Sequence, residues 1–146
     1  MDQVMPVERI LFPIDFSPFS QASFKSLPNQ FNMNCTDCIL LHTFRLVNTG
    51  QSSPLDYKRQ KEEETLEFFR RFKEEHKSEH VNYQLINEVG FLSARILHNL
   101  NSRRISLLIL SSDVQKKLMP PNDIGIEKLM EKVKCPTLLL TDWLII

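Results

Sequence analysis

The sequence predicts an α/β protein built as one domain, an open five-stranded parallel sheet with helices on both faces. Two observations predict this fold. Five short apolar segments alternate along the chain with segments that have helical periodicity or helix-start signals, a pattern typical of parallel sheets with right-handed helical crossovers. The chain has 146 residues, of which 42% are hydrophobic and 25% charged, as expected for a single domain covering residues 1–146.

The charge balance and composition of the chain bear on whether it binds nucleic acid or a membrane. The 18 basic residues balance the 18 acidic ones, so no bulk field favours nucleic acid or an anionic membrane. No apolar segment approaches the roughly 20 residues that span a bilayer, and residues 1–6 lack the basic and apolar regions of a signal peptide. Three cysteines form an odd set. We therefore expect a cytoplasmic protein with reduced thiols, no nucleic-acid partner and no membrane partner.

The first two strands are expected at residues 9–15 and 37–44. Residues 9–15 form an apolar run that ends in Asp15, as in a buried parallel strand. Pro13 has no N–H for the ladder, so it must lie near the strand end. Ser17 followed by Pro18 predicts a helix start.

A loop is expected over residues 45–56, followed by a charged helix over 57–78. The alternation of apolar and polar residues over 81–87 predicts a strand with one exposed face, at an edge of the sheet. Gly90 predicts a turn, and a short helix with Leu92 on its apolar face is expected to follow it.

The last third of the chain predicts two further strands. Residues 105–110 are the most apolar strand, which we expect to be central. A polar loop over 111–122 leads to a helix over 123–133 and a final strand over 136–141.

Polar residues follow two of these strands directly. Ligands of open parallel sheets bind outside the carboxyl ends of the strands, where the strand order reverses. Those ends carry Asp15, Phe16 and Ser17 after the first strand, and Ser111 and Ser112 after the fourth. A ligand site is expected there.

Four segments, in order, resemble universal stress proteins. They are RILFPIDFS (9–17), ILLHT (39–43), LLIL (107–110) and EKLMEKVKCPTLLL (127–140). The resemblance implies a Rossmann-like sheet of order 3-2-1-4-5, a role in the stress response, and a homodimer formed through the final strand.

Members of this family that bind ATP carry Gly-x-x-Gly after the fourth strand, and later Gly-Ser or Gly-Thr. Glycines let backbone N–H groups approach phosphates closely. Here Ser111 and Val114 stand in the first two places, and Asp123-Ile124 or Ile124-Gly125 in the last pair. Pro120 and Pro121 remove two further donors. The sequence therefore predicts that the phosphate cradle is lost.

We expect a stress-response accessory protein that acts by homodimerisation and association with a protein partner, without catalysis and without a cofactor. The alternative is a nucleotide-binding or sensing module for ATP or AMP with a degenerate phosphate loop. Its site residues are Asp15, Phe16, Ser111 and Ser112. An apolar edge is normally covered or paired, so the expected dimer interface consists of Thr137, Leu138, Leu139, Leu140, Thr141 and Trp143.

Two other readings of local motifs are weaker. Phosphohydrolases of the haloacid dehalogenase type also place an aspartate after the first strand, but they need a second one where Ser17 stands, so the magnesium site lacks a ligand. Cys35 and Cys38 form Cys-x-x-Cys before a strand, whereas redox pairs of this spacing lie at a helix N-terminus. No metal site is expected.

Overall fold

The structure is a computed structural model, and it describes residues 9–18, 21–22, 25, 36–46, 50, 53–77 and 81–140. Within these residues the elements are β1 (Arg9–Pro13), β2 (Thr36–Phe44), α2 (Pro54–Glu75), β3 (Val81–Val89), α3 (Leu92–Ser102), β4 (Leu107–Leu110), α4 (Ser112–Lys117), α5 (Ile126–Lys132) and β5 (Thr137–Leu139). The predicted helix after β1 is described in part, because residues 18, 21, 22 and 25 have helical backbone.

The five strands form one parallel sheet of order β3-β2-β1-β4-β5, which confirms the predicted fold class. Leu11 pairs with Ile39 on one side and with Leu108 on the other. The central strand is therefore β1, and the expectation that residues 105–110 are central was wrong. Both β1 and β4 are buried on both faces, so their apolar character alone could not show which of the two lies at the centre of the sheet.

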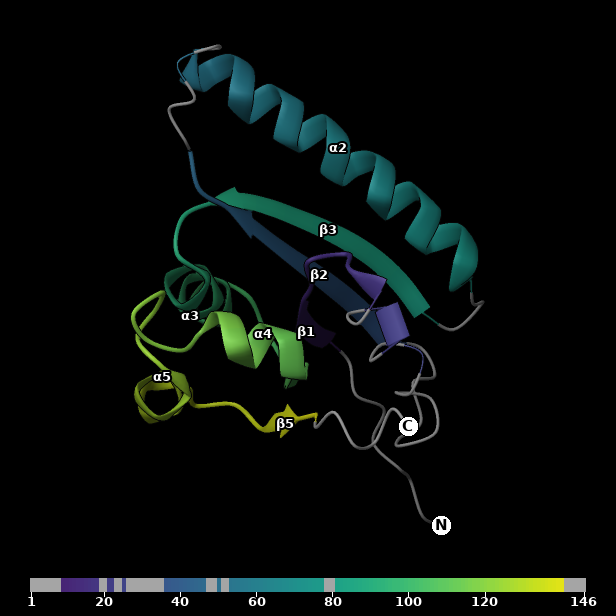
Figure 1. The fold of residues 1–146 in the computed structure, drawn as a ribbon. Coiled ribbons are helices and arrows are strands. Elements are labelled where there is room, and N and C mark those ends of the chain that lie inside the picture. Colours follow the sequence, from purple (N-terminus) through teal and green to yellow (C-terminus); the bar gives the residue numbers. More distant parts are fainter. Residues whose placement is uncertain are drawn as a thin grey trace.

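Apolar side chains of alternate strand residues build a core on each face of the sheet. The face under α2 holds Phe12 of β1 and Phe72 of α2. The opposite face holds Leu11, packed with Ile96 of α3 and Leu129 of α5. Figure 1 shows this layering, with α2 over one face and α3, α4 and α5 over the other. Strand β3 lies at one edge, as predicted.

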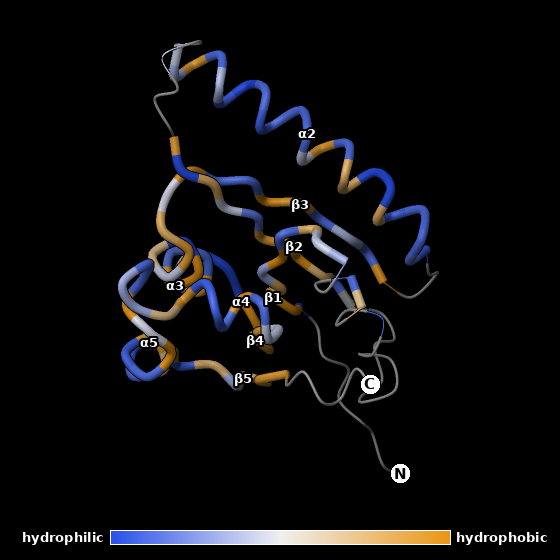
Figure 2. The backbone as a smooth tube through the Cα atoms, in the orientation of Figure 1, coloured by the Kyte–Doolittle hydropathy of each residue, from blue (hydrophilic) through white to orange (hydrophobic). Residues whose placement is uncertain are grey.

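Helix α2 begins at Pro54, inside the segment that was predicted to be a loop. The Ser53 side chain caps the helix by accepting a hydrogen bond from the N–H of Asp56, at 3.2 Å. A hydroxyl cap followed by proline at the first helical position is a strong start signal. Figure 2 shows α2 as mostly hydrophilic along its length, and only Thr65 and Phe72 are buried.

Three boundaries in the last third differ from prediction. The segment predicted as a loop over 111–122 contains α4, with Asp113 in its first turn and Lys116 and Lys117 in its last, charges that favour a helix through its dipole. Helix α5 is shorter than predicted because Gly125, with φ of 92°, precedes it. Strand β5 covers only Thr137–Leu139.

Candidate functional site

A cavity of about 360 Å³ opens at the carboxyl edge of the sheet, where a ligand site was expected. We call it the edge cavity. It lies where the chain leaves β1 and β2, between the start of α3 and the end of α4. Its lining residues are Ile14, Asp15, His42, Thr43, Phe44, Arg45, Gly90, Phe91, Leu92, Lys117, Asn122 and Asp123.

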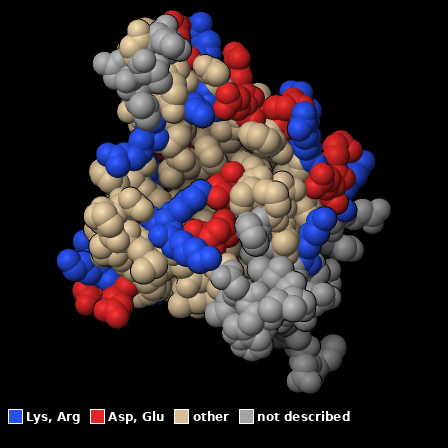
Figure 3. All heavy atoms as spheres, viewed as in Figure 1, with Lys and Arg blue, Asp and Glu red and all other residues tan. Residues whose placement is uncertain are grey.

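The Asp15 carboxylate is engaged on both oxygens. Its Oδ1 accepts a hydrogen bond from the N–H of Ser17 at 2.8 Å. Its Oδ2 lies 2.5 Å from the Lys117 ammonium nitrogen. The ammonium group therefore offsets the negative charge that Asp15 brings to the cavity. On the face drawn in Figure 3, basic and acidic side chains of the described residues lie beside one another over α4 and along α2.

Phe16 has a positive φ of 61°, which a non-glycine residue adopts only at a cost in backbone energy. Its side chain is buried and packs against the rings of His42, Phe68 and Phe72. The ring thus belongs to the core beneath α2, and Phe16 is not among the residues that line the edge cavity.

His42 connects the edge cavity to α2. Its Nδ1 lies 2.9 Å from Oδ1 of Asn87, an acceptor, so Nδ1–H donates. The hydroxyl of Thr65 lies 3.5 Å from the same nitrogen. Burial lowers the pKa of His42 most strongly, the Asn87 bond opposes this, and Lys117 lowers the pKa further. We conclude that His42 is neutral near pH 7.

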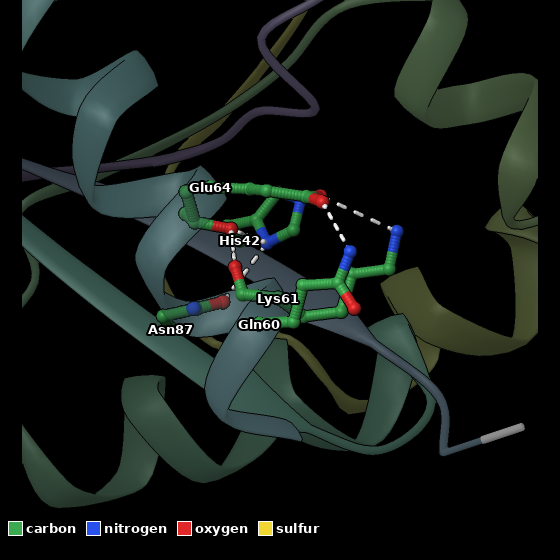
Figure 4. Close-up of polar contacts among 6 residues, drawn as sticks. His42, Gln60, Lys61, Glu64 and Asn87 are labelled. Carbon is green, nitrogen blue, oxygen red and sulfur yellow. Dashed lines mark hydrogen bonds and ion pairs between the residues drawn. The ribbon is translucent and has the colours of Figure 1, made fainter. Parts of the chain in front are cut away.

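Three polar residues of α2 near His42 interact with one another. Figure 4 shows Gln60 and Lys61 directed toward the carboxylate of Glu64. Gln60 Nε2 lies 3.3 Å from one carboxylate oxygen of Glu64, and Lys61 Nζ lies 3.5 Å from the other. These three residues of α2 are therefore paired with one another.

Asp123 closes the edge cavity on the side of α3. The N-cap of α3, Phe91, supplies no side-chain hydrogen bond. Asp123 supplies it instead, accepting from the N–H of Ser93 at 3.1 Å, from the Ser93 hydroxyl and from the N–H of Ile124 at 2.7 Å. Sequence reasoning missed Ser93, because no local pattern connects it to an aspartate 30 residues later.

The two serines that follow β4 do not reach the edge cavity. Ser111 is fully buried, and its hydroxyl has no hydrogen-bond partner among the described residues. Ser112 lines a separate cavity of about 800 Å³ between α4, α5 and the end of β5. Of the four residues predicted to bind a nucleotide, only Asp15 therefore lines the edge cavity.

The described residues contain no group of three or more His, Cys, Asp or Glu side chains placed to hold a metal ion. Cys38 is fully buried, and burial raises the pKa of its thiol, which opposes formation of a reactive thiolate. Cys35, the other half of the Cys-x-x-Cys, lies outside the described residues. Among the described helices, none is long and apolar enough to cross a membrane.

Strand β5 is paired on one side only within the described sheet. Thr137 and Leu138 are half-buried, and Leu139 is 43% exposed. Leu140 is buried, and its N–H donates to the carbonyl of Leu110 at 2.9 Å. The other two residues of the expected dimer interface, Thr141 and Trp143, lie outside the described residues.

Comparison with known proteins shows similarity in three dimensions. No protein-family model matches the sequence, and no curated protein sequence matches it. The hypothetical protein MJ0577 is 20% identical, with a TM-score of 0.71 over 92% of this chain and 95% of that one.

Two further solved structures carry nucleotides. A universal stress protein family protein from Arabidopsis thaliana with AMP bound is 14% identical, with a TM-score of 0.60 over 91% of this chain and 90% of that one. A universal stress protein in complex with cAMP is 10% identical, with a TM-score of 0.57 over 92% and 97%. These likenesses show that the chain has the fold of universal stress proteins.

Proposed function

We propose that this protein is a universal stress protein that acts by association, as an accessory in a stress response, without catalysis and without tight nucleotide binding. The fold and the resemblance of four sequence segments support the family. The observation that carries the functional proposal is the Lys117–Asp15 ion pair inside the edge cavity. It engages Asp15, the one predicted site residue that lines the edge cavity.

The connection between β4 and α5 supports the same proposal. A phosphate cradle needs backbone N–H groups that point at the anion. Here Val114 is buried within α4, and Pro120 and Pro121 contribute no N–H to the connection. Asp123 adds a carboxylate on the far side of the cavity, and a carboxylate repels phosphate.

Isothermal titration with magnesium ATP, AMP and cAMP tests this proposal. We expect dissociation constants weaker than about 10 μM, which corresponds to roughly −7 kcal/mol. Mass spectrometry of the denatured protein's supernatant supplies an independent check for nucleotide carried through purification. Tighter binding of any of the three ligands would refute the association proposal.

A nucleotide-sensing role is the second candidate, because a cavity remains at the expected edge and two proteins of this fold carry AMP or cAMP. Arg45, whose guanidinium lies 4.2 Å from the Phe91 ring centroid at the cavity, offers a cation for a phosphate. Under this candidate, AMP binds and Arg45→Ala weakens it severalfold, while Arg59→Ala on α2 leaves it unchanged. Equal affinities in all three proteins would reject the role of Arg45, and a wild-type protein that does not bind AMP would reject the nucleotide-sensing candidate.

We further propose a homodimer formed by the free edge of β5. Pairing two such edges satisfies backbone groups and gives an isologous interface. Analytical ultracentrifugation should show a dimer at tens of micromolar, which Leu139→Lys weakens and the exposed control Leu66→Lys on α2 does not. A wild-type protein that sediments as a monomer would exclude the dimer.

A further inference from the structure

The cavity of about 800 Å³ between α4, α5 and the end of β5 is larger than the edge cavity and is not part of it. We call it the terminal cavity. Its apolar lining comes from Met119, Pro120, Ile124, Ile126 and Leu140. Met119 is 56% exposed. Apolar hollows of this size bind apolar groups, because filling them removes that surface from water.

The chain itself leaves the sheet at this cavity. The carbonyl of Leu140 accepts a hydrogen bond from Nε2 of Gln115 at 2.8 Å. The same nitrogen donates to the carbonyl of Leu110 at 3.0 Å. Gln115 and Leu140 both line the terminal cavity, so the point from which residue 141 continues is held at its wall.

The six residues that follow are Thr141, Asp142 and the apolar run Trp143–Ile146. A chain extends by at most about 3.6 Å per residue. Whatever path it takes, the Cα of Trp143 therefore lies within about 11 Å of the Cα of Leu140. An apolar segment is thus tethered to the wall of an apolar cavity.

We propose that the segment Trp143–Ile146 docks into the terminal cavity of its own chain and covers Met119, Ile124 and Ile126. Charge agrees with this placement. Asp142 directly precedes the segment and is the one acid among residues 141–146. The exposed charged residues of the cavity lining are two cations and one anion, Lys116, Lys128 and Glu127, so the lining carries a net positive charge.

The covalent link from Leu140 favours docking of the chain's own segment over docking of the segment of a second copy. A short linker gives an effective concentration in the millimolar range or above. A second copy at micromolar concentration cannot compete with that when both have the same sequence. Docking removes Trp143 from the expected dimer interface and leaves Thr137–Leu139 of β5 for pairing, so this inference does not depend on the proposed dimer.

Trp143 is the only tryptophan, so its fluorescence tests the proposal in the full-length chain. We expect a blue-shifted emission and weak quenching by acrylamide. Met119→Asp should shift the emission to the red and raise the quenching constant severalfold. Leu66→Asp is the matched control, because Leu66 lies on α2 and its exposed fraction, 51%, is close to that of Met119. This substitution should change neither the emission nor the quenching constant.

A second variant keeps the test decisive if Met119→Asp does not fold. Leu144→Asp combined with Ile145→Asp alters only the segment itself. It should expose Trp143 and increase binding of the apolar dye anilinonaphthalene sulfonate severalfold, as the cavity opens. Circular dichroism verifies that each variant is folded.

Three results would overturn the proposal. A solvent-exposed Trp143 in the wild type means that the segment is not docked. A buried Trp143 that ignores both sets of substitutions means that it is docked elsewhere. An emission that changes on dilution through the micromolar range assigns the segment to a second copy.

Discussion

Asp123 accepts a hydrogen bond from the backbone N–H of Ser93 at 3.1 Å and another from the Ser93 hydroxyl, across 30 positions of the chain. It thereby caps α3 from the connection between β4 and α5. An anion at a helix N-terminus is stabilised by the free N–H groups and by the helix dipole. The protein's own carboxylate thus occupies a place at this cavity where a ligand anion would be favoured.

Replacing Asp123 should destabilise the protein. We expect Asp123→Ala to lower the free energy of unfolding by about 1–2 kcal/mol, the usual value of a lost cap. Asp123→Asn keeps an acceptor and should lose less. Urea denaturation measures both, with Asn122→Ala, an exposed neighbour, as control. An Asp123→Ala protein as stable as the control would show that the cap contributes nothing.

The Lys117–Asp15 pair should contribute little to stability, because the Lys117 side chain is 54% exposed. Partly exposed pairs are worth about 0.2–1 kcal/mol and are screened by salt. We expect Lys117→Ala to cost less than Asp15→Ala, which also removes the acceptor of the Ser17 N–H and should cost at most about 1–2 kcal/mol.

A double-mutant cycle at low and high salt measures this coupling, and Lys116→Ala is the control for loss of one positive charge. A coupling of several kcal/mol, unaffected by salt, would contradict the exposed character of the pair. We expect no phosphatase activity in the wild-type protein that either Lys117→Ala or Asp15→Ala could remove. Phosphatase activity that disappears with Asp15→Ala would instead revive the hydrolase reading.

Stability should fall on acidification because of His42. Burial holds its folded-state pKa below the ordinary 6.5, so the unfolded chain binds the proton more readily. The free energy of unfolding therefore decreases as pH falls from about 6.5 through the folded-state pKa. Lys117 and Lys61 act in the same direction as burial, and Asp15 opposes them.

Urea denaturation between pH 7 and 5 measures this effect. His42→Gln should make the decrease in stability shallower. His98→Gln, on the exposed side of α3, should reproduce the wild-type pH dependence. If His42→Gln also reproduced it, the proposed neutral state of His42 would be wrong.

Cys38 should be chemically silent in the folded protein. It is fully buried in the core beneath α2, and burial raises its thiol pKa. In a Cys35→Ser, Cys135→Ser variant, Ellman's reagent should label Cys38 only after unfolding. Labelling that is complete within minutes in native buffer would contradict this environment.

Phe16 offers a test of backbone strain. Its ring is buried, so Phe16→Ala should cost about 3–5 kcal/mol. Glycine normally destabilises by roughly 0.5–1 kcal/mol relative to alanine, but φ of 61° favours glycine at this position. We therefore expect Phe16→Gly to be at least as stable as Phe16→Ala in thermal denaturation. The usual order, with alanine more stable, would show that no strain is stored there.

The sequence by itself determined the sheet and much of its order along the chain. Segments such as 37–44 and 81–87 are apolar or alternating over short lengths, and that pattern depends on local burial alone. The same reasoning placed Asp15 at the carboxyl edge, because it closes the apolar run that forms β1 and lies two residues after the last residue of that strand. It did not find α4, because the six residues of this helix include one apolar residue, Val114, which is too few to form a stripe.

Only the tertiary structure decided which side chains meet at the edge cavity and how they are paired. It placed Lys117 on Asp15 and Asp123 on Ser93, and it buried Ser111 while leaving Asp15 at the cavity. These pairings join residues far apart in the chain through the path of the β4–α5 connection. Hydrogen bonds and ion pairs depend on distances of a few ångströms, and no local periodicity in a sequence encodes those distances.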